Sequence, residues 1–184
     1  MANSATPPGD ATVTRLEFDA MIARGRAEPG ETRTLQCRTV ATGRLQQMNY
    51  IRDLPAQAVM EDERQDLSSE SFAPNASEAL LAALGSCLAV GIHANALAQG
   101  IPISTLELSL SANINTTAIW GAGNSTPKII GFDEISVSVK LIADAPRKAL
   151  EALVRHATLW SPVANTIHNP VHLDVTLQAD PVPA

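Results

Sequence analysis

Two cysteines, Cys37 and Cys87, are the residues of this chain best suited to covalent chemistry. They are too few to form a disulfide framework, so we expect free thiols in a reducing, cytoplasmic compartment. A cysteine attacks as its thiolate, and an ordinary thiol ionises only near pH ~8.5. A reactive cysteine therefore needs a cation nearby, and without one it packs as a small hydrophobe.

Arg44 is the candidate for that cation. It follows Thr42 and Gly43, which mark a tight turn between two segments rich in β-forming residues, so it is expected at or just after the tip of a hairpin. A helix dipole acts mainly on the first turn, and Cys87 is about three turns into its predicted helix. The dipole alone therefore cannot activate this thiol. The alternative for Arg44 is a solvated hairpin residue.

Glu78 and Ser161 are further candidate site residues. Glu78 precedes Cys87 by nine positions, which on a regular helix places it on the opposite side and about 13 Å away along the axis. It could reach a thiol across a dimer interface, or it could cap the helix together with Asn75. Ser161 could hydrogen-bond a sulfenate or a substrate, or it could simply end a helix before Pro162.

Neither a metal nor another cofactor is expected. The four histidines do not follow a compact metal-ligating spacing; they are His93, His156, His168 and His172. His93, in an apolar helix, is expected to be a hydrogen-bonded core residue. Cys37 alternates with Leu35, which indicates an inward-facing strand residue. It could react with an oxidised Cys87, or it could be a buried structural thiol.

Hydrophobic periodicity predicts an α+β fold of antiparallel strands with packed helices. Helices are expected over residues 14–24, 75–99 and 144–160, with Asp144 as an N-cap, and a helical turn over 164–168. Strands are expected over residues 32–40, 45–51, 56–60, 106–114, 134–141 and 171–177. The helix over 75–99 is apolar nearly all round, so we expect it to be buried at the centre.

Composition excludes several classes of partner. The formal net charge of −6 argues against nucleic acid and against an anionic membrane surface. The N-terminus has no charged start followed by an apolar stretch, so it is not expected to be a signal peptide. Gly85, Gly91 and His93 interrupt the longest apolar segment, which favours a buried soluble helix over a membrane span. Residues 1–30 are expected to be a flexible extension with a short helix, and 31–184 a single domain.

Two segments resemble the OsmC/Ohr family. Residues 74–87, P-N-A-S-E-A-L-L-A-A-L-G-S-C, are similar to the family's P-x-E-L-L-L-A-A-L-G-x-C segment. Residues 161–166, S-P-V-A-N-T, are similar to its C-P-V-S-x-T segment, and the order of elements over 32–178 also fits. The resemblance implies an OsmC-like fold, with antiparallel sheets around the central helix. It also implies an intertwined homodimer with the active site at the subunit interface.

The resemblance also implies a chemistry. In the family the helix cysteine attacks a hydroperoxide and becomes a sulfenic acid, and the cysteine of the C-P-V segment then closes a disulfide that dithiols reopen. An Arg from the first hairpin and a Glu near the start of the helix hold the thiolate. By position Cys87 matches the attacking cysteine and Arg44 the hairpin Arg. Ser161 stands where the resolving cysteine belongs. Ser77 stands where the peroxidase branch has its Glu, and Glu78 matches less characterised branches.

The leading hypothesis is an enzyme that reduces organic hydroperoxides and protects against oxidative stress. Cys87 would be its single peroxidatic cysteine, and an external thiol or Cys37 would reduce the sulfenate. The alternative is a non-catalytic dimer that binds a small apolar ligand, which the missing cysteine at 161 and the shifted Glu favour. Thioester hydrolysis ranks last, because the sequence offers no identifiable Cys–His–acid arrangement.

Overall fold

The chain is described by a computed structural model over residues 14–30, 32–43, 45–60, 73–115, 121–122, 126 and 130–178. The elements in chain order are α1 (Arg15–Ala27), β1 (Arg38–Ala41), β2 (Gln46–Tyr50), β3 (Gln57–Met60), α2 (Ala76–Gln99), β4 (Ile103–Ile114), β5 (Phe132–Ala143), α4 (Arg147–Trp160) and α5 (Pro162–His168). This arrangement confirms the predicted α+β class.

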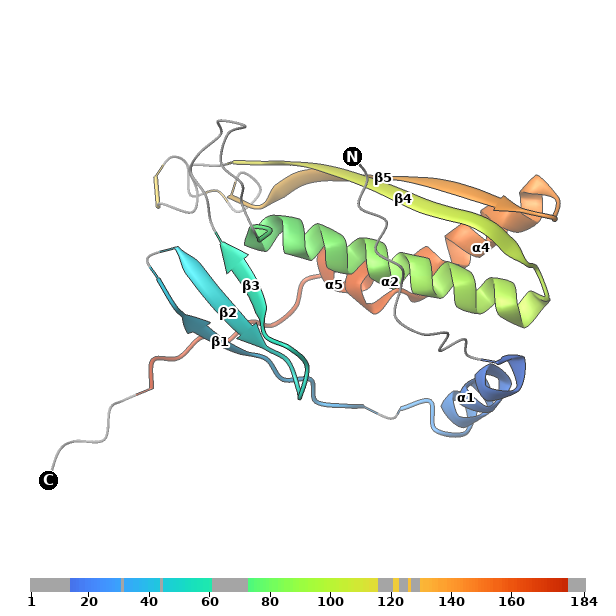
Figure 1. Cartoon of the computed structure of the whole chain (residues 1–184), viewed down its shortest axis with the longest axis horizontal. Helices are drawn as coiled ribbons and strands as arrows, with labels where there is room; N and C mark the ends of the chain where they lie inside the picture. The colour runs from blue at the N-terminus through green and yellow to red at the C-terminus, as the bar shows by residue number, and fades with distance from the viewer. Residues whose placement is uncertain are drawn as a thin grey trace, which may run out of the picture.

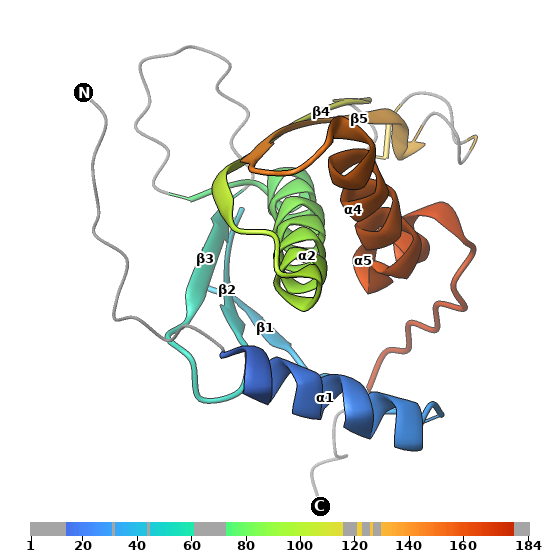
Figure 2. The same cartoon turned by 90° about the vertical axis from the view of Figure 1, so that its right-hand side faces the viewer.

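Two antiparallel sheets and a pair of helices surround α2 (Figures 1 and 2). One sheet has the order β1-β2-β3 and the other is the β4-β5 pair. The β4-β5 sheet covers one side of α2, the β1-β2-β3 sheet lies on another, and α4 and α5 pack alongside. The central place of α2 is therefore as the sequence predicts.

Local sequence signals fix both ends of α2. The Asn75 side chain accepts a hydrogen bond from the backbone N–H of Glu78, and the Glu78 carboxylate accepts one from the backbone N–H of Asn75. This is the capping box expected from the spacing. At the other end Gly100 adopts a left-handed conformation with φ of 68°, and its N–H donates to the carbonyls of Ala96 and Leu97. Glycine adopts this conformation without the steric cost that a Cβ would bring.

One face of α2 is buried and the opposite face is not. The buried residues are one turn apart and form a single stripe: Leu84, Leu88, Ile92 and Ala96. Val90, on the other side, is 68% exposed. The expectation that α2 is buried all round is therefore wrong for the single chain, because the elements around α2 leave the side with Val90 exposed. By length and composition, α2 is the one helix of the described residues that could cross a membrane, a test that core helices of soluble proteins also pass.

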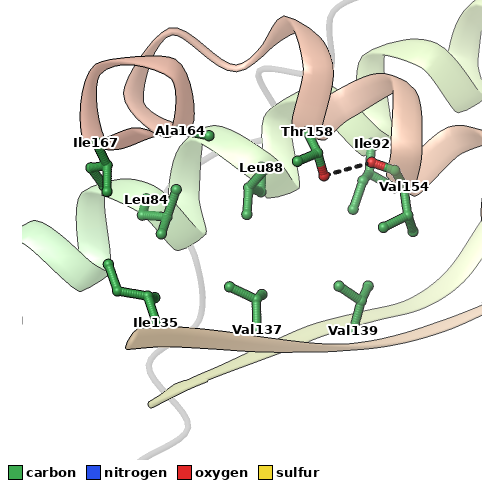
Figure 3. Close-up of a pocket in the computed structure, with 10 residues that line it drawn as sticks. All are labelled: Leu84, Leu88, Ile92, Ile135, Val137, Val139, Val154, Thr158, Ala164 and Ile167. Carbon is green, nitrogen blue, oxygen red and sulfur yellow. Dashed lines mark hydrogen bonds between the residues drawn. The ribbon is translucent and has the colours of Figure 1, made fainter. Parts of the chain in front are cut away.

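The β4-β5 sheet carries the alternation predicted from the sequence. Leu108 lies opposite Val139 and Leu110 lies opposite Val137, so the apolar side chains of both strands share one face. On β5 that face is turned toward the helices, as the side chains of Val137 and Val139 show (Figure 3). A Cβ added at Gly85 of α2 would lie 2.9 Å from a methyl carbon of Leu110, so a larger residue there would require the Leu110 side chain to move.

The N-terminal helix α1 is joined to the far end of α2. Its N-cap, Thr14, forms the predicted capping box with Glu17, and these hydrogen bonds hold the pKa of Glu17 below its ordinary value. The Arg15 guanidinium donates to the carbonyl of Ala98 at 3.0 Å. A cation at a helix C-terminus interacts favourably with the helix dipole. Arg15 therefore ties α1 to α2 by a polar contact.

Three predicted elements differ from the structure. The first strand begins at Arg38 instead of residue 32. The N-cap position of α4 is Pro146, with no side-chain cap, instead of Asp144. Residues 171–177 form no strand, although their apolar side chains alternate as expected. A strand requires a ladder partner, and no described strand pairs with this segment, whose Val171 and Leu177 are 63% and 98% exposed.

Candidate active site at Cys87 and Ser161

Cys87 and Ser161 meet in the fold although they lie 74 positions apart in the sequence. The Ser161 hydroxyl donates a hydrogen bond to the Cys87 sulfur, with 3.1 Å between Oγ and Sγ. Ser161 is 3% exposed, and Cys87 is half-buried. The structure therefore brings together two of the predicted site residues. They are Cys87 and Ser161, the serine at the position of the family's second cysteine.

The position of Ser161 follows from the break between α4 and α5. Ser161 is the C-cap of α4 and also the N-cap of α5, where Pro162 occupies the first helical position. Its Oγ accepts a hydrogen bond from the backbone N–H of Ala164 at 3.1 Å. A hydroxyl has one proton to donate. Because the Ala164 N–H already engages a lone pair, that proton is left for the sulfur.

A close helix crossing sets the distance between the two side chains. Gly91 lies one turn after Cys87 on α2, and Ala157 lies one turn before Ser161 on α4. A Cβ added at Gly91 would be 3.1 Å from the Cβ of Ala157 and 3.4 Å from its Cα. The antiparallel helices therefore touch at the residue pair adjacent to the site. A larger residue at Gly91 would push them apart and lengthen the contact between Ser161 and Cys87.

Asn165 holds the break in place, a role the sequence reasoning missed. Its side-chain amide donates to the carbonyls of Leu159 and Ser161, at 3.0 and 2.8 Å. The Leu159 carbonyl lies in the last turn of α4, where helix carbonyls lack an intrahelical partner, and the Ser161 carbonyl also accepts from the backbone N–H of Asn165 at 3.0 Å. The sequence does contain a signal for this role. An amide side chain one turn after a Ser-Pro pair that ends a helix can reach the carbonyls at that helix end.

Cys87 lies at the border between the buried and exposed faces of α2. At 100° per residue it is rotated by about 120° from the centre of the buried stripe and by roughly 80° from the middle of the opposite face. That exposed face is made up of small and apolar residues with one histidine: Ala83, Ser86, Val90 and His93. A molecule that approaches this face would reach the sulfur without opening the core.

The other two predicted site residues are not joined to the thiol. Arg44 lies outside the described residues. The Glu78 carboxylate is engaged in the capping box, where it accepts from the Asn75 N–H at 2.9 Å. The capping alternative is therefore observed for Glu78. Roles for Arg44 and Glu78 in the reaction remain predictions.

Two expectations about neighbouring residues are wrong. Cys37 is exposed and lies just before β1 instead of facing inward from a strand. His93 is exposed on α2 instead of being a core residue. Both errors have one physical cause, because an apolar local pattern does not tell whether the chain itself supplies the covering element. Among the residues that the structure describes, no group of His, Cys, Asp and Glu could hold a metal ion.

A partly open apolar cavity lies near the site, between β5 and the three helices (Figure 3). Its volume is about 210 Å³. Ala164, whose N–H bonds Ser161, forms part of its wall, whereas Cys87 does not line it. The sulfur is therefore not part of the cavity wall.

Solved structures share this fold at low sequence identity. An OsmC-like protein from Mycoplasma pneumoniae is 16% identical with a TM-score of 0.61, over 75% of this chain and 89% of that one. A hypothetical protein from Aquifex aeolicus is 14% identical with a TM-score of 0.58, over 74% and 89%. An organic hydroperoxide resistance protein OsmC from Legionella pneumophila is 19% identical with a TM-score of 0.50, over 74% and 90%.

Sequence comparison identifies the family directly. No curated protein is detectably similar to the chain. The family model described as OsmC-like protein, however, matches residues 68–176, which include both Cys87 and Ser161. The match covers more than half of the chain, and the solved structures carry the same fold. The chain belongs to the OsmC-like protein family.

Proposed function

We propose that this protein reduces organic hydroperoxides with Cys87 as its single peroxidatic cysteine. The observation that carries the proposal is the hydrogen bond from Ser161 to the Cys87 sulfur, 3.1 Å long and shielded by the α4–α5 break. A donor aimed at sulfur favours the charged thiolate over the neutral thiol. Family membership and the hydroperoxide resistance of the Legionella pneumophila protein support the same reaction class.

The first step oxidises the thiolate by two electrons. The sulfur of Cys87 attacks one oxygen of the hydroperoxide, an S–O bond forms, and the O–O bond breaks. The peroxide leaves as an alkoxide, which takes a proton and becomes an alcohol. The product on the protein is a sulfenic acid. Ser161 remains within hydrogen-bond reach and stabilises the sulfenate as it stabilised the thiolate.

The second half of the cycle requires an external thiol. Ser161 cannot form a disulfide, so the sulfenic acid reacts with a small thiol to give a mixed disulfide and water. A second thiol molecule then attacks the outer sulfur of that mixed disulfide, which releases Cys87 as a thiolate and forms the disulfide of the two small thiols. The exposed Cys37 is the alternative reductant within the protein.

Arg44 is assigned the role of the cation that supports the thiolate and orients the peroxide. Glu78 is assigned a supporting role at the start of α2, where its carboxylate already bonds the helix N-terminus. A carboxylate held there can accept hydrogen bonds from a neighbouring guanidinium. These two roles follow the family pattern.

The protein is further proposed to act as a cytoplasmic homodimer. Support comes from the exposed face of α2 and from the alternating, exposed apolar side chains between Val171 and Leu177. A second copy that covers these surfaces would bury them and would place Cys87 at the subunit interface. The proposed dimer therefore also explains why α2 is apolar on the side that one chain leaves open.

Consumption of cumene hydroperoxide in the presence of dithiothreitol tests the proposal. Wild-type protein should consume the peroxide, and a sulfenic acid probe such as dimedone should label Cys87. The Cys87→Ser variant should fall to the rate of buffer alone, whereas Cys37→Ser is the matched control and should retain activity. Undiminished consumption by Cys87→Ser would overturn the proposal.

The alternative is an OsmC-like dimer that binds a small ligand without catalysis. The serine at 161 and the engagement of Glu78 in a helix cap favour it. This alternative requires that wild-type protein consume no peroxide and that no label appear at Cys87. The same assay therefore separates the two functions.

A further inference from the structure

The interior beside β5 is not filled by the side chains that surround it. Ile135, Val137 and Val139 of β5 face Leu84, Leu88 and Ile92 of α2 across the cavity of about 210 Å³ (Figure 3). Protein interiors are normally packed to the density of organic crystals. An apolar cavity of about 150 Å³ stays dry and accepts benzene. The cavity here is large enough for an alkyl chain and too small for a helix.

A more open groove adjoins the cavity, between β5 and α4. The groove has a volume of about 740 Å³ and shares Val137, Val139 and Val154 with the cavity. Because β5 and α4 run in opposite directions from the turn that joins them, the groove leads from that turn toward α5. The two spaces therefore lie next to each other and are together called the channel, with the cavity as its more enclosed inner end and the groove as its open outer end.

The open end of the channel carries one arginine that lies outside the ion pairs of the described residues. Arg147 pairs with Glu151 at 2.8 Å. Lys140 lies 3.8 Å from the carboxylate of Glu107, and both side chains project from the solvent-facing side of the β4-β5 sheet, opposite the helices. Arg155 lines the groove and has no ion pair within the described part of the chain. Its guanidinium is the group available for an anion.

We propose that this channel binds a straight-chain monocarboxylate of medium length. The alkyl chain occupies the inner cavity, and the carboxylate lies at the groove, where it meets Arg155. The cavity wall suits methylene groups because it is apolar except for Thr158, whose hydroxyl already donates to the carbonyl of Val154. A guanidinium binds a carboxylate through two parallel N–H donors. The chemistry of the two ends selects an amphipathic anion over a neutral hydrocarbon.

The proposal is independent of the peroxidase function. Cys87 does not line either part of the channel, so a Cys87→Ser variant should bind the carboxylate as wild type does. Loss of peroxidase activity and loss of carboxylate binding are therefore separate outcomes.

Isothermal titration of the full-length protein with sodium octanoate tests the site. Each methylene that enters the cavity should strengthen binding roughly fourfold, so affinity should rise from butyrate through hexanoate to octanoate. Arg155→Gln should weaken octanoate binding about tenfold, as expected for loss of a charge-assisted hydrogen bond. Arg24→Gln, on α1, is the matched control and should bind as wild type does.

A second variant tests the inner end of the channel, which is the cavity. Ala164→Leu keeps the backbone N–H that bonds Ser161 and adds methyl groups to the cavity, so it should abolish octanoate binding without lowering the melting temperature. Absence of binding by wild type, equal binding of butyrate and octanoate, or no effect of Arg155→Gln would each overturn the proposal. So would dissociation of a dimer on addition of octanoate, since the channel would then hold a second copy of the chain.

Discussion

The two long sides of α2 differ in how fully the rest of the same chain covers them. On one side Leu84, Leu88 and Ile92 are buried beneath the sheet and α4, and Cys87 has a defined hydrogen-bond partner close by. On the other side Val90 is 68% exposed. One side is therefore covered by the rest of the chain, and the other, the open side, has the composition of an interior without its cover.

This difference separates two sources of function. The chain alone positions the sulfur, because the Gly91–Ala157 crossing and the α4–α5 break lie on the covered side of α2. The route by which a substrate reaches that sulfur belongs to the open side. A partner that covers the open side would therefore shape access to Cys87 without changing the contact with Ser161.

A charge on the open side should have the largest effect. Val90→Asp should weaken a homodimer by roughly a hundredfold, because an unpaired carboxylate would be buried at the interface. Ser109→Asp is the matched control, since Ser109 lies on the solvent-facing side of β4. Sedimentation velocity over a range of concentrations measures both. Equal association of Val90→Asp and wild type would show that this face is not the interface.

A larger residue at the helix crossing should have the next largest effect. Gly91→Val should lower the free energy of unfolding by about 2 kcal/mol, because overpacking forces α2 and α4 apart. The rate of Cys87 alkylation should change with it, since Ser161 moves with α4. Nothing lies within 4 Å of a Cβ placed at Gly25, so Gly25→Val should leave both quantities close to wild type. Thermal unfolding and timed alkylation measure these two quantities. Equal values for Gly91→Val and Gly25→Val would contradict this account.

Loss of the serine hydroxyl should have the smallest effect on stability and a specific one on chemistry. Ser161→Ala removes the N-cap of α5, which should cost about 1 kcal/mol. It also removes the donor to sulfur, so the rate of Cys87 alkylation at fixed pH should change. Thr166→Ala is the control, because it removes a hydroxyl of α5 that bonds the Pro162 carbonyl and not the sulfur. Identical alkylation rates for Ser161→Ala and wild type would leave Ser161 with a structural role alone.

The sequence predicts well the features that depend on near neighbours. The capping boxes at Thr14 and Asn75 need only residues three positions apart, and both are present. The alternation in β4 and β5 correctly identifies the face that packs on the helices. The α4–α5 break at Ser161 is likewise visible in the Ser-Pro pair.

Features that depend on distant residues or on a partner are harder to predict. The contact of Ser161 with Cys87 joins positions 74 apart, and only the family resemblance pointed to that pair. Cys37 and His93 were expected to face inward, and both are exposed, because local periodicity marks an apolar side without naming what covers it. The segment between Val171 and Leu177 shows the same limit, since its strand pattern has no ladder partner among the described strands.

The placement of Ser161 also has an evolutionary consequence. Serine and cysteine codons can differ by a single base, and a sulfur at this position would start within about 3 Å of its partner in the fold. A single mutation could therefore convert a protein that depends on an external thiol into one with its own resolving cysteine. The backbone that holds the α4–α5 break serves either residue, so a lineage could lose or regain the second thiol without rebuilding the scaffold.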